Sequence, residues 1–550
     1  MEKTTEDRPL SPDPAPAEPA DEGPAETDPR RHRGLAVGVR IASHAAVWSA
    51  VLVPTLVELA RGWRAFGDDA AIASRSYQVF SMHVPLTGLA SAASFQTGHA
   101  VFDPGPMLFY LLSAPVRIDP AHGLMWGAAL WAGIALSVAV EAAWSVARWV
   151  GAAVVAFVVL DLLWLTPQVF DNLPWNAYLP VPFLLAAVAL AVAVSTGATR
   201  WWPVLVVAAS VAAESHLIFV VPAVALVVVS LVLGLVVGER PRKLGWVWAG
   251  LAVGVACWLA PLVQQLEGPH GNISAILHSG KGQSTFGASL GFREIGLAAG
   301  AHPIWLTHLP QSFLKVAHLE TAHAPWYGAV VLALLAVGAV AAYLSGRRGL
   351  GGLCAATAAV GAGFVVSFAV FPTKNVISLG YLVDFLWVVG ILMWVAFLWG
   401  LGAIALAVAR TMPAVRTTSL ERLAPWIGLA AIAGALGGVG ATGFTAASNP
   451  AAVGWSRADV TLIQTAVAAI ERQVPAGPVT VVVLTPNFFI GTWGTEAIAY
   501  RLESDGWAPN TGGGPASYSG LSLRGAVPAT AIVHLSGLRV TSVGIQRTPD

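Results

Sequence analysis

Long runs of apolar residues dominate the chain, and they do not alternate with polar residues as strands do. A helix needs roughly 20 residues to cross a hydrocarbon core about 30 Å thick. The pattern therefore predicts an all-α polytopic membrane protein with about 11 transmembrane helices. The predicted spans are 34–60, 121–146, 149–166, 177–196, 201–215, 217–237, 245–264, 324–344, 350–371, 380–408 and 424–446.

The two ends of the chain lack this pattern. Residues 1–33 are rich in Pro, Glu and Asp and contain too little apolar surface to offset the entropy of ordering, which predicts a disordered cytoplasmic tail. Residues 34–446 form the predicted transmembrane domain, and residues 447–550 a small extracytoplasmic α/β domain. In the latter, periodicity predicts helices at 457–473 and 495–504 and strands at Val479–Leu484 and Ala531–Leu535.

Basic residues of short loops favour the cytoplasmic side of a membrane protein. With a cytoplasmic N-terminus, the short loops rich in Lys and Arg all fall on that side. This predicts a multi-pass protein of the cell membrane, whereas an even number of helices would invert half of these assignments. The residues concerned are Arg148, Arg200, Arg240, Arg242, Lys243, Arg347, Arg348, Arg410, Arg416 and Arg422.

Composition supports the membrane assignment and excludes one class of partner. The chain is 56% hydrophobic and only 11% charged, with a mean hydropathy of +0.68. Its 30 basic and 30 acidic residues balance, so the concentrated positive field of a nucleic-acid binder is absent. Cys257 and Cys354 both lie in apolar runs, which indicates small core residues rather than a metal site or a disulfide.

Polar, motif-like segments gather on the predicted outer face. The first external loop, 61–120, contains an apolar stretch at 106–117 that is too short to span and is predicted to lie along the interface. A second external loop, 265–323, is long enough to act as a lid or acceptor groove. The shorter outer segments are 167–176, 214–216 and 372–379.

An acidic pair, Asp68 and Asp69, opens the first external loop after Gly67, and Arg75 follows one to two turns later. Two adjacent carboxylates raise the pKa of one of them, which makes a usable general base. If residues 69–80 are helical, the pair lies at the helix N-terminus, where the dipole favours an anion. The alternative is that Asp68 is simply an N-cap and Arg75 an interfacial anchor.

This arrangement resembles the membrane-embedded glycosyltransferases of the GT-C fold, and most closely the actinobacterial GT-C-like proteins related to the ArnT/PMT-like superfamily. The motifs are Gly-Asp-Asp-Ala at 67–70 with the downstream Arg75, and Phe-Asp-Pro-Gly-Pro at 102–106 leading into Phe109 and Tyr110. Pro-Trp-Asn at 174–176 and Glu-Ser-His at 214–216 are weaker matches. The resemblance covers roughly residues 34–265.

The resemblance implies a polyprenyl-phosphate sugar as donor, inversion at the anomeric carbon, and an Asp of the first loop as catalytic base. Asp103 stands where the family has His, so this residue is either a substitute ligand or a turn residue. The matching positions imply substrate contacts at Asp103, Tyr110, Trp175, Asn176 and His216. The alternatives are an interfacial aromatic belt for Trp175 and Tyr110, and a polar residue satisfied by its neighbours for His216.

The chemistry fits these residue types. Attack by an acceptor hydroxyl on the anomeric carbon requires a base, for which Asp68 and Asp69 are the candidates. The departing lipid phosphate requires a cation, for which Arg75 is the first candidate and Lys374 the second. No cofactor is certain beyond the lipid-linked donor, although an acidic pair could bind a divalent metal.

The sequence thus predicts a hexosyl- or pentosyltransferase of the cell envelope, with a polyprenyl-phosphate sugar, a cell-envelope acceptor and the lipid bilayer as its partners. Two alternative hypotheses about the function stay open. One is a transporter or flippase for a lipid-linked or small polar substrate, although paired repeats and midplane charges are not evident. The other is a non-catalytic scaffold that presents the C-terminal domain.

Overall fold

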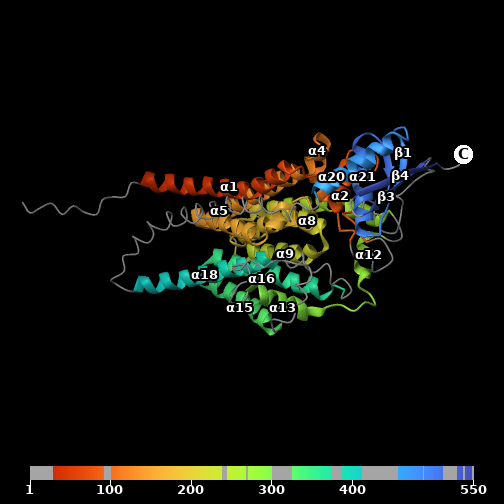
Figure 1. Ribbon diagram of the computed structural model, residues 1–550. Helices are drawn as coiled ribbons and strands as arrows, with labels where there is room; N and C mark the ends of the chain where they lie inside the picture. The colour runs from red at the N-terminus through yellow and green to blue at the C-terminus, as the bar shows by residue number, and fades with distance from the viewer. Residues whose placement is uncertain are drawn as a thin grey trace, which may run out of the picture.

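The computed structural model describes most of the chain (Figure 1). The described residues are 29–91, 94, 101–237, 244–267, 271–299, 325–372, 386–411, 456–486, 488–511, 529–536 and 539–547. The first 28 residues, the predicted span 424–446 and residues 300–323 of the second external loop therefore lie outside the described residues.

Apolar helices form the body of the molecule, and the protein is a multi-pass membrane protein. Six helices of the described part are long and apolar enough to cross a membrane, or seven when the bent pair α10 and α11 counts as one span. The body contains α1 (Pro29–Ala60), α5 (Gly123–Leu165), α7 (Pro180–Ser195), α8 (Trp202–Ser215), α9 (Val220–Val237), α10 (Leu244–Cys257), α11 (Leu259–Leu266), α15 (Pro325–Leu344), α16 (Arg348–Ala369) and α18 (Leu386–Thr411).

The predicted number of 11 spans is not confirmed, for identifiable reasons. Helices α7 and α8 have only 16 and 14 residues, which is short for a span. Each starts later than predicted, with a Pro in its first turn. Helix α5 runs over 43 residues, about 64 Å if straight, but its backbone is non-helical at Ala147 and Arg148. That break lies where the sequence separates 121–146 from 149–166.

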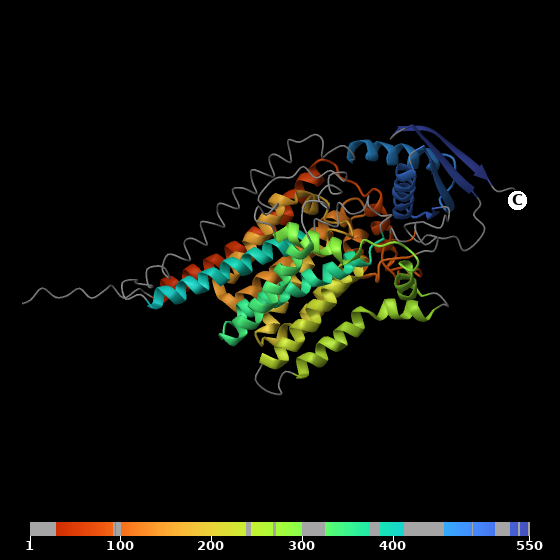
Figure 2. The same cartoon turned by 90° about the horizontal axis from the view of Figure 1, so that it is seen from below.

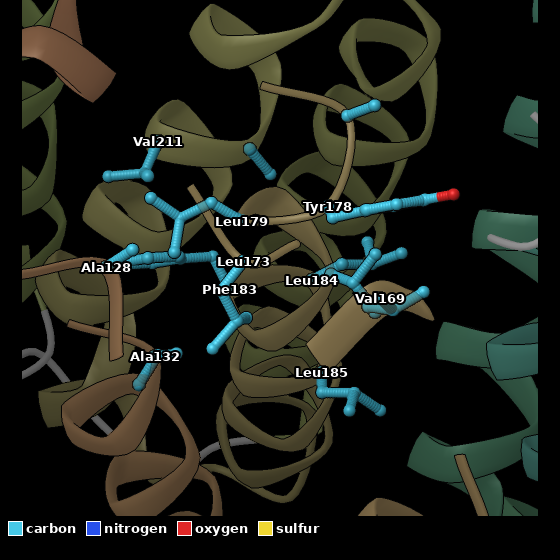
Figure 3. Close-up of a cluster of buried hydrophobic side chains, with 14 of the residues drawn as sticks. Ala128, Ala132, Val169, Leu173, Tyr178, Leu179, Phe183, Leu184, Leu185 and Val211 are labelled. Atoms are coloured by element: carbon cyan, nitrogen blue, oxygen red, sulfur yellow. The ribbon is translucent and has the colours of Figure 1, made fainter. Parts of the chain in front are cut away.

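Small residues allow the helices of the body to pack closely. Ala128 and Ala132 of α5 join Leu179 and Phe183, and Val211 of α8, in one buried cluster (Figure 3). Gly363 of α16 lies so close to Pro222 that an added Cβ would be 2.5 Å from the proline Cα. Such contacts are typical of membrane helices, where close packing replaces the hydrophobic effect between helices.

The short loops that carry basic residues lie together at one end of the helical body. The hydroxyl of Tyr343 donates a hydrogen bond to the carbonyl oxygen of Ser195, 3.2 Å away. Gly349 lies against Val146, at the end of the first half of α5. This end therefore holds the loops that carry Arg148, Arg200, Arg347 and Arg348. The sequence predicts these loops on the same side of the membrane.

Helices that are too short to span connect or cover the body. Helix α13 packs against α15, α16 and α18, so this part of the predicted second external loop contributes to the helical body. Helix α4 corresponds to the predicted interfacial stretch 106–117. The short helices are α2 (Asp68–Gln78), α4 (Met107–Ile118), α6 (Pro167–Asp171), η1 (Thr199–Trp201), η2 (Leu217–Phe219), α12 (Asn272–Ser279) and α13 (Gly287–Ala299).

The C-terminal region forms a four-stranded sheet in the order β2-β1-β3-β4. Strand β1 pairs in parallel with β2 and β3, and β4 is antiparallel to β3. The sheet and its helices lie at one end of the body, beside α2 and α4 (Figures 1 and 2). The elements are α20 (Ser456–Glu471), β1 (Pro478–Leu484), α21 (Phe488–Ser504), β2 (Ala508–Asn510), β3 (Ala529–Ser536) and β4 (Arg539–Arg547).

Candidate active site

Helix α2 begins with the acidic pair. Asp68 and Asp69 are its first two residues, and Gly67 precedes them with a φ of 59°. A positive φ is accessible to glycine at little cost, so Gly67 can turn the chain sharply into the helix. Both carboxylates are partly buried and lie in the first turn, where the free N–H groups of the helix favour negative charge.

Asp68 is held by a residue far away in the sequence. The indole Nε1 of Trp175 donates a hydrogen bond to Oδ2 of Asp68 over 2.9 Å. Burial raises the pKa of Asp68, and the bond from Trp175 opposes that rise. The structure thus joins the first external loop to the Pro-Trp-Asn segment, two pieces that the sequence singles out separately.

Asp69 has the freer carboxylate of the pair. Within the described part of the chain, no hydrogen bond to its side-chain oxygens is found. Burial, followed by the neighbouring charge of Asp68, raises the pKa of Asp69 to about 8. Because the two groups influence each other, their protons come off as those of a pair. A carboxyl group whose pKa lies near neutral pH, beside a second carboxylate that is held in place, is a suitable arrangement for a general base.

Asp103 is a buried hub rather than an open ligand. It is 2% exposed, and its two oxygens accept hydrogen bonds from Nδ2 of Asn176 (2.8 Å) and from the backbone N–H of Leu217 (3.1 Å). Burial raises the pKa of Asp103 to about 8, against the effect of these two donors. Asn272 binds the same turn, because its Nδ2 donates to the carbonyl oxygens of Phe102 and Asp103. Asp103 and Asn176 thus bond to each other and tie three loops together.

Arg75 lies two turns beyond the acidic pair, near the end of α2. Its guanidinium carbon is 5.9 Å from the ring centroid of Phe109 on α4, and no ion pair is found for it among the described residues. Burial lowers the pKa of Arg75 to about 10, whereas the charges of Glu496 and Glu503 act to raise it. The group remains cationic at neutral pH. An ionised guanidinium without a bonded carboxylate can receive an anionic ligand.

The remaining predicted site residues are placed differently. The hydroxyl of Tyr110 donates to the carbonyl oxygen of Pro85, 2.7 Å away. His216 accepts a hydrogen bond from the backbone N–H of Ile218, and burial lowers its pKa to about 4, so its ring is neutral. Lys374 lies outside the described residues.

Four residues of this region were missed by sequence reasoning. Glu214 is completely buried and lies against Gly105, where an added Cβ would be 2.1 Å from its Oε2. The sequence indicated the segment 214–216 but favoured the histidine in it. No local pattern predicted the contacts of Asn272, Glu496 and Glu503, since these depend on which helix faces meet.

No group of three or more His, Cys, Asp or Glu side chains in the described ranges is arranged to hold a metal ion. The pair Asp68 and Asp69 therefore offers two carboxylates and no third ligand of this type from the same part of the chain. Two carboxylates can still take part in a site completed by substrate phosphate oxygens and water.

Comparisons with known proteins found little sequence similarity. No family model matches the chain, and no curated protein matches it. Among solved structures, the chain is similar to the crystal structure of ArnT from Cupriavidus metallidurans in the apo state, with 16% identity, coverage of 86% of this chain and 85% of that chain, and a TM-score of 0.45. At this TM-score the similarity does not by itself assign the fold or the function of this chain.

Proposed function

We propose that this protein is a membrane glycosyltransferase of the GT-C type, which moves a sugar from a polyprenyl-phosphate donor to a cell-envelope acceptor on the extracytoplasmic side. The observation that carries the proposal is the layout of α2. One short helix beside the apolar body has an acidic pair at its N-terminus and, two turns later, an arginine for which no ion pair is found among the described residues. A base for the acceptor and a cation for the leaving phosphate are the two groups that the reaction requires.

In the proposed reaction, an acceptor hydroxyl oxygen attacks the anomeric carbon of the donor sugar. Its proton passes to the Asp69 carboxylate, while Asp68 stays hydrogen-bonded to Trp175. The bond between the anomeric carbon and the phosphate oxygen breaks, and the polyprenyl phosphate leaves with the bonding electrons. Arg75 stabilises the added negative charge on that phosphate, with Lys374 as a second candidate. A single displacement of this kind inverts the anomeric configuration.

Other predicted residues have supporting roles in this proposal. Asp103 and Asn176 hold the loops, because their polar atoms already bond to each other. Tyr110 and the ring face of Trp175 are the proposed sugar contacts, since an aromatic face covers the apolar side of a pyranose. His216 is neutral, so it can bond to a sugar hydroxyl without adding charge.

The test is transfer of radiolabelled sugar from a synthetic polyprenyl-phosphate donor in proteoliposomes. Asp69→Asn is expected to lower the turnover by about 100-fold or more. Glu471→Gln, an exposed acidic position at the end of α20, is the matched control and should retain activity. Arg75→Gln is expected to raise the KM for the donor, and Arg75→Lys to recover only part of the loss because lysine cannot bind a phosphate bidentately.

Two results would exclude this function. Full transfer by both Asp68→Asn and Asp69→Asn would remove the proposed base. Accumulation of labelled donor inside sealed vesicles without any sugar transfer would instead indicate a transporter or flippase.

Loss of transfer on addition of EDTA, with recovery on Mg²⁺, would show that a divalent metal joins the acidic pair.

A further inference from the structure

The C-terminal domain packs directly onto the helix that carries the acidic pair. On α21, the indole of Trp493 covers Gly67, where an added Cβ would be 2.9 Å from Cγ of the tryptophan. Phe66 meets the same indole edge to face, with ring centroids 6.4 Å apart. Tyr500 of α21 donates a hydrogen bond to the carbonyl oxygen of Pro120 (2.7 Å). The domain therefore contacts both the start of α2 and the end of the first external loop.

A carboxylate from this domain binds two successive turns of α2. Oε2 of Glu503 accepts a hydrogen bond from Oγ of Ser74 (2.6 Å), and Oε1 accepts one from Nε2 of Gln78 (3.0 Å). Ser74 and Gln78 are 1% and 4% exposed, and they are bonded to each other over 3.2 Å. A carboxylate that receives one donor on each oxygen fixes the rotation of α2 about its axis.

Glu503 also affects the charge of Arg75, which lies between Ser74 and Gln78 in the sequence of α2. The negative charges of Glu496 and Glu503 both favour the charged form of Arg75. Burial raises the pKa of the Glu503 carboxyl, whereas its donors on α2 and the cations Arg117 and Arg75 favour its charged form. A negative charge close to Arg75 offsets part of the attraction between that guanidinium and an anionic ligand.

We infer that Glu503 is a positioning residue of the sugar-transfer site: through Ser74 and Gln78 it holds α2 in place, and through its charge it weakens the resting attraction of Arg75 for the donor phosphate. This inference rests on the proposed function for its second part. The hold on α2 is independent of any reaction. The C-terminal domain accordingly supports the helix that carries the proposed catalytic residues, and Glu503 acts through α2 and not on the substrate.

Glu503→Ala should lower both kcat and the KM for the donor, for separate reasons. Loss of the hold displaces Asp69 and should lower kcat by about 10- to 100-fold, because small misplacements of catalytic groups are costly. Loss of the charge should lower the KM for the polyprenyl-phosphate donor roughly two- to five-fold. A domain that was merely unstable would reduce the amount of active enzyme and leave KM unchanged.

Glu503→Gln separates hydrogen bonding from charge. The amide oxygen can accept one of the two bonds, so the hold on α2 is partly restored, whereas the charge is absent as in Glu503→Ala. We expect an intermediate kcat and the same lowered KM. The matched control is Arg501→Ala on the exposed face of α21, whose partner Asp505 also lies outside the contact with α2.

The second readout is amide hydrogen exchange of the full chain in detergent, followed over residues 68–78. Glu503→Ala should speed exchange in this segment about tenfold or more relative to both wild type and Arg501→Ala. Unchanged exchange together with unchanged kcat and KM would overturn the inference. If Glu503→Ala does not fold, Glu503→Gln and Ser74→Ala decide the question by the same measurements. If the wild type transfers no sugar, the proposed function fails while the exchange data still decide whether Glu503 holds α2.

Discussion

The indole nitrogen of Trp175 donates a hydrogen bond to Asp68 across 107 positions of sequence. This bond fixes one carboxylate of the acidic pair and leaves the other with no hydrogen-bond partner among the described side chains. The two acids of a symmetrical-looking motif thus acquire different environments. Such a difference is what separates the roles of paired carboxylates in enzymes.

Trp175→Phe is the direct test of this bond. The ring remains, but Asp68 loses its donor, so its pKa should rise further and the pair should hold its proton more tightly. We expect kcat to fall about tenfold and the activity profile to shift to higher pH. Trp248→Phe, at a position 68% exposed on α10, is the control for loss of an indole. Equal pH profiles in wild type and Trp175→Phe would contradict the proposed coupling.

The pH dependence of activity follows from Asp69. As a base it must be ionised, and its pKa is raised to about 8. Turnover should therefore increase as the pH rises through about 8 and level off above it. A pH–rate profile in proteoliposomes measures this directly, and a profile that is flat between pH 6 and 9 would argue against Asp69 as the base.

The stability of the folded protein should also depend on Asp69, but it should decrease as the pH rises, whereas activity increases. A carboxyl whose pKa is raised on folding favours the folded state below its unfolded pKa, and this advantage is lost as the pH rises through the folded value. Asp69→Asn removes the cost of ionising the buried acid. We expect the variant to have a higher apparent Tm than wild type at pH 8, with the gap closing towards pH 4. Light scattering on heating in detergent can measure it.

Asp103 should behave as a structural residue. Asp103→Ala leaves the donors of Asn176 and Leu217 buried without an acceptor, which should cost on the order of 2 kcal/mol and lower the apparent Tm by several degrees. Asp103→Asn keeps one acceptor and should lie between this variant and wild type. A normal Tm for Asp103→Ala with complete loss of transfer would instead place Asp103 on the substrate.

Two glycines with positive φ provide a matched test of the domain contact. Gly67→Ala and Gly62→Ala both strain the backbone, since φ is 59° and 84°. Only at Gly67 does the new methyl group collide with Trp493, whereas a Cβ added at Gly62 meets no atom of the described residues within 4 Å. We expect Gly67→Ala alone to accelerate proteolytic release of the C-terminal domain, by about tenfold. Equal release from both variants would mean that Trp493 tolerates the displacement.

The proposed orientation can be tested by cysteine labelling. In a Cys257→Ser, Cys354→Ser background, Met82→Cys introduces a thiol at a position 95% exposed in the first external loop. A membrane-impermeant maleimide should label it in right-side-out vesicles. Ser345→Cys, exposed at the basic end of the body, should react only after permeabilisation. The reverse labelling pattern would place the acidic pair in the cytoplasm and exclude a lipid-linked donor from the outer leaflet.

Local sequence determined the helical, membrane-spanning character of the protein, since the thickness of the bilayer dictates how long an apolar run must be. It also determined that the acidic pair opens a helix and that Arg75 lies about two turns later, because a glycine followed by acids specifies a helix N-terminus. The strands around Val479 and Ala531 were visible for a similar reason, as short β-branched and apolar runs.

Tertiary structure alone decided which of these pieces meet. Nothing local relates Asp68 to Trp175, turns Asp103 inward to Asn176, or brings Glu503 onto Ser74. Periodicity reports which face of a segment is buried, but the partner of that face depends on how all the helices pack together. Packing therefore made one acid anchored and left the other without a hydrogen-bond partner among the described residues, near the cation Arg75. The chemistry proposed for this protein depends on that difference.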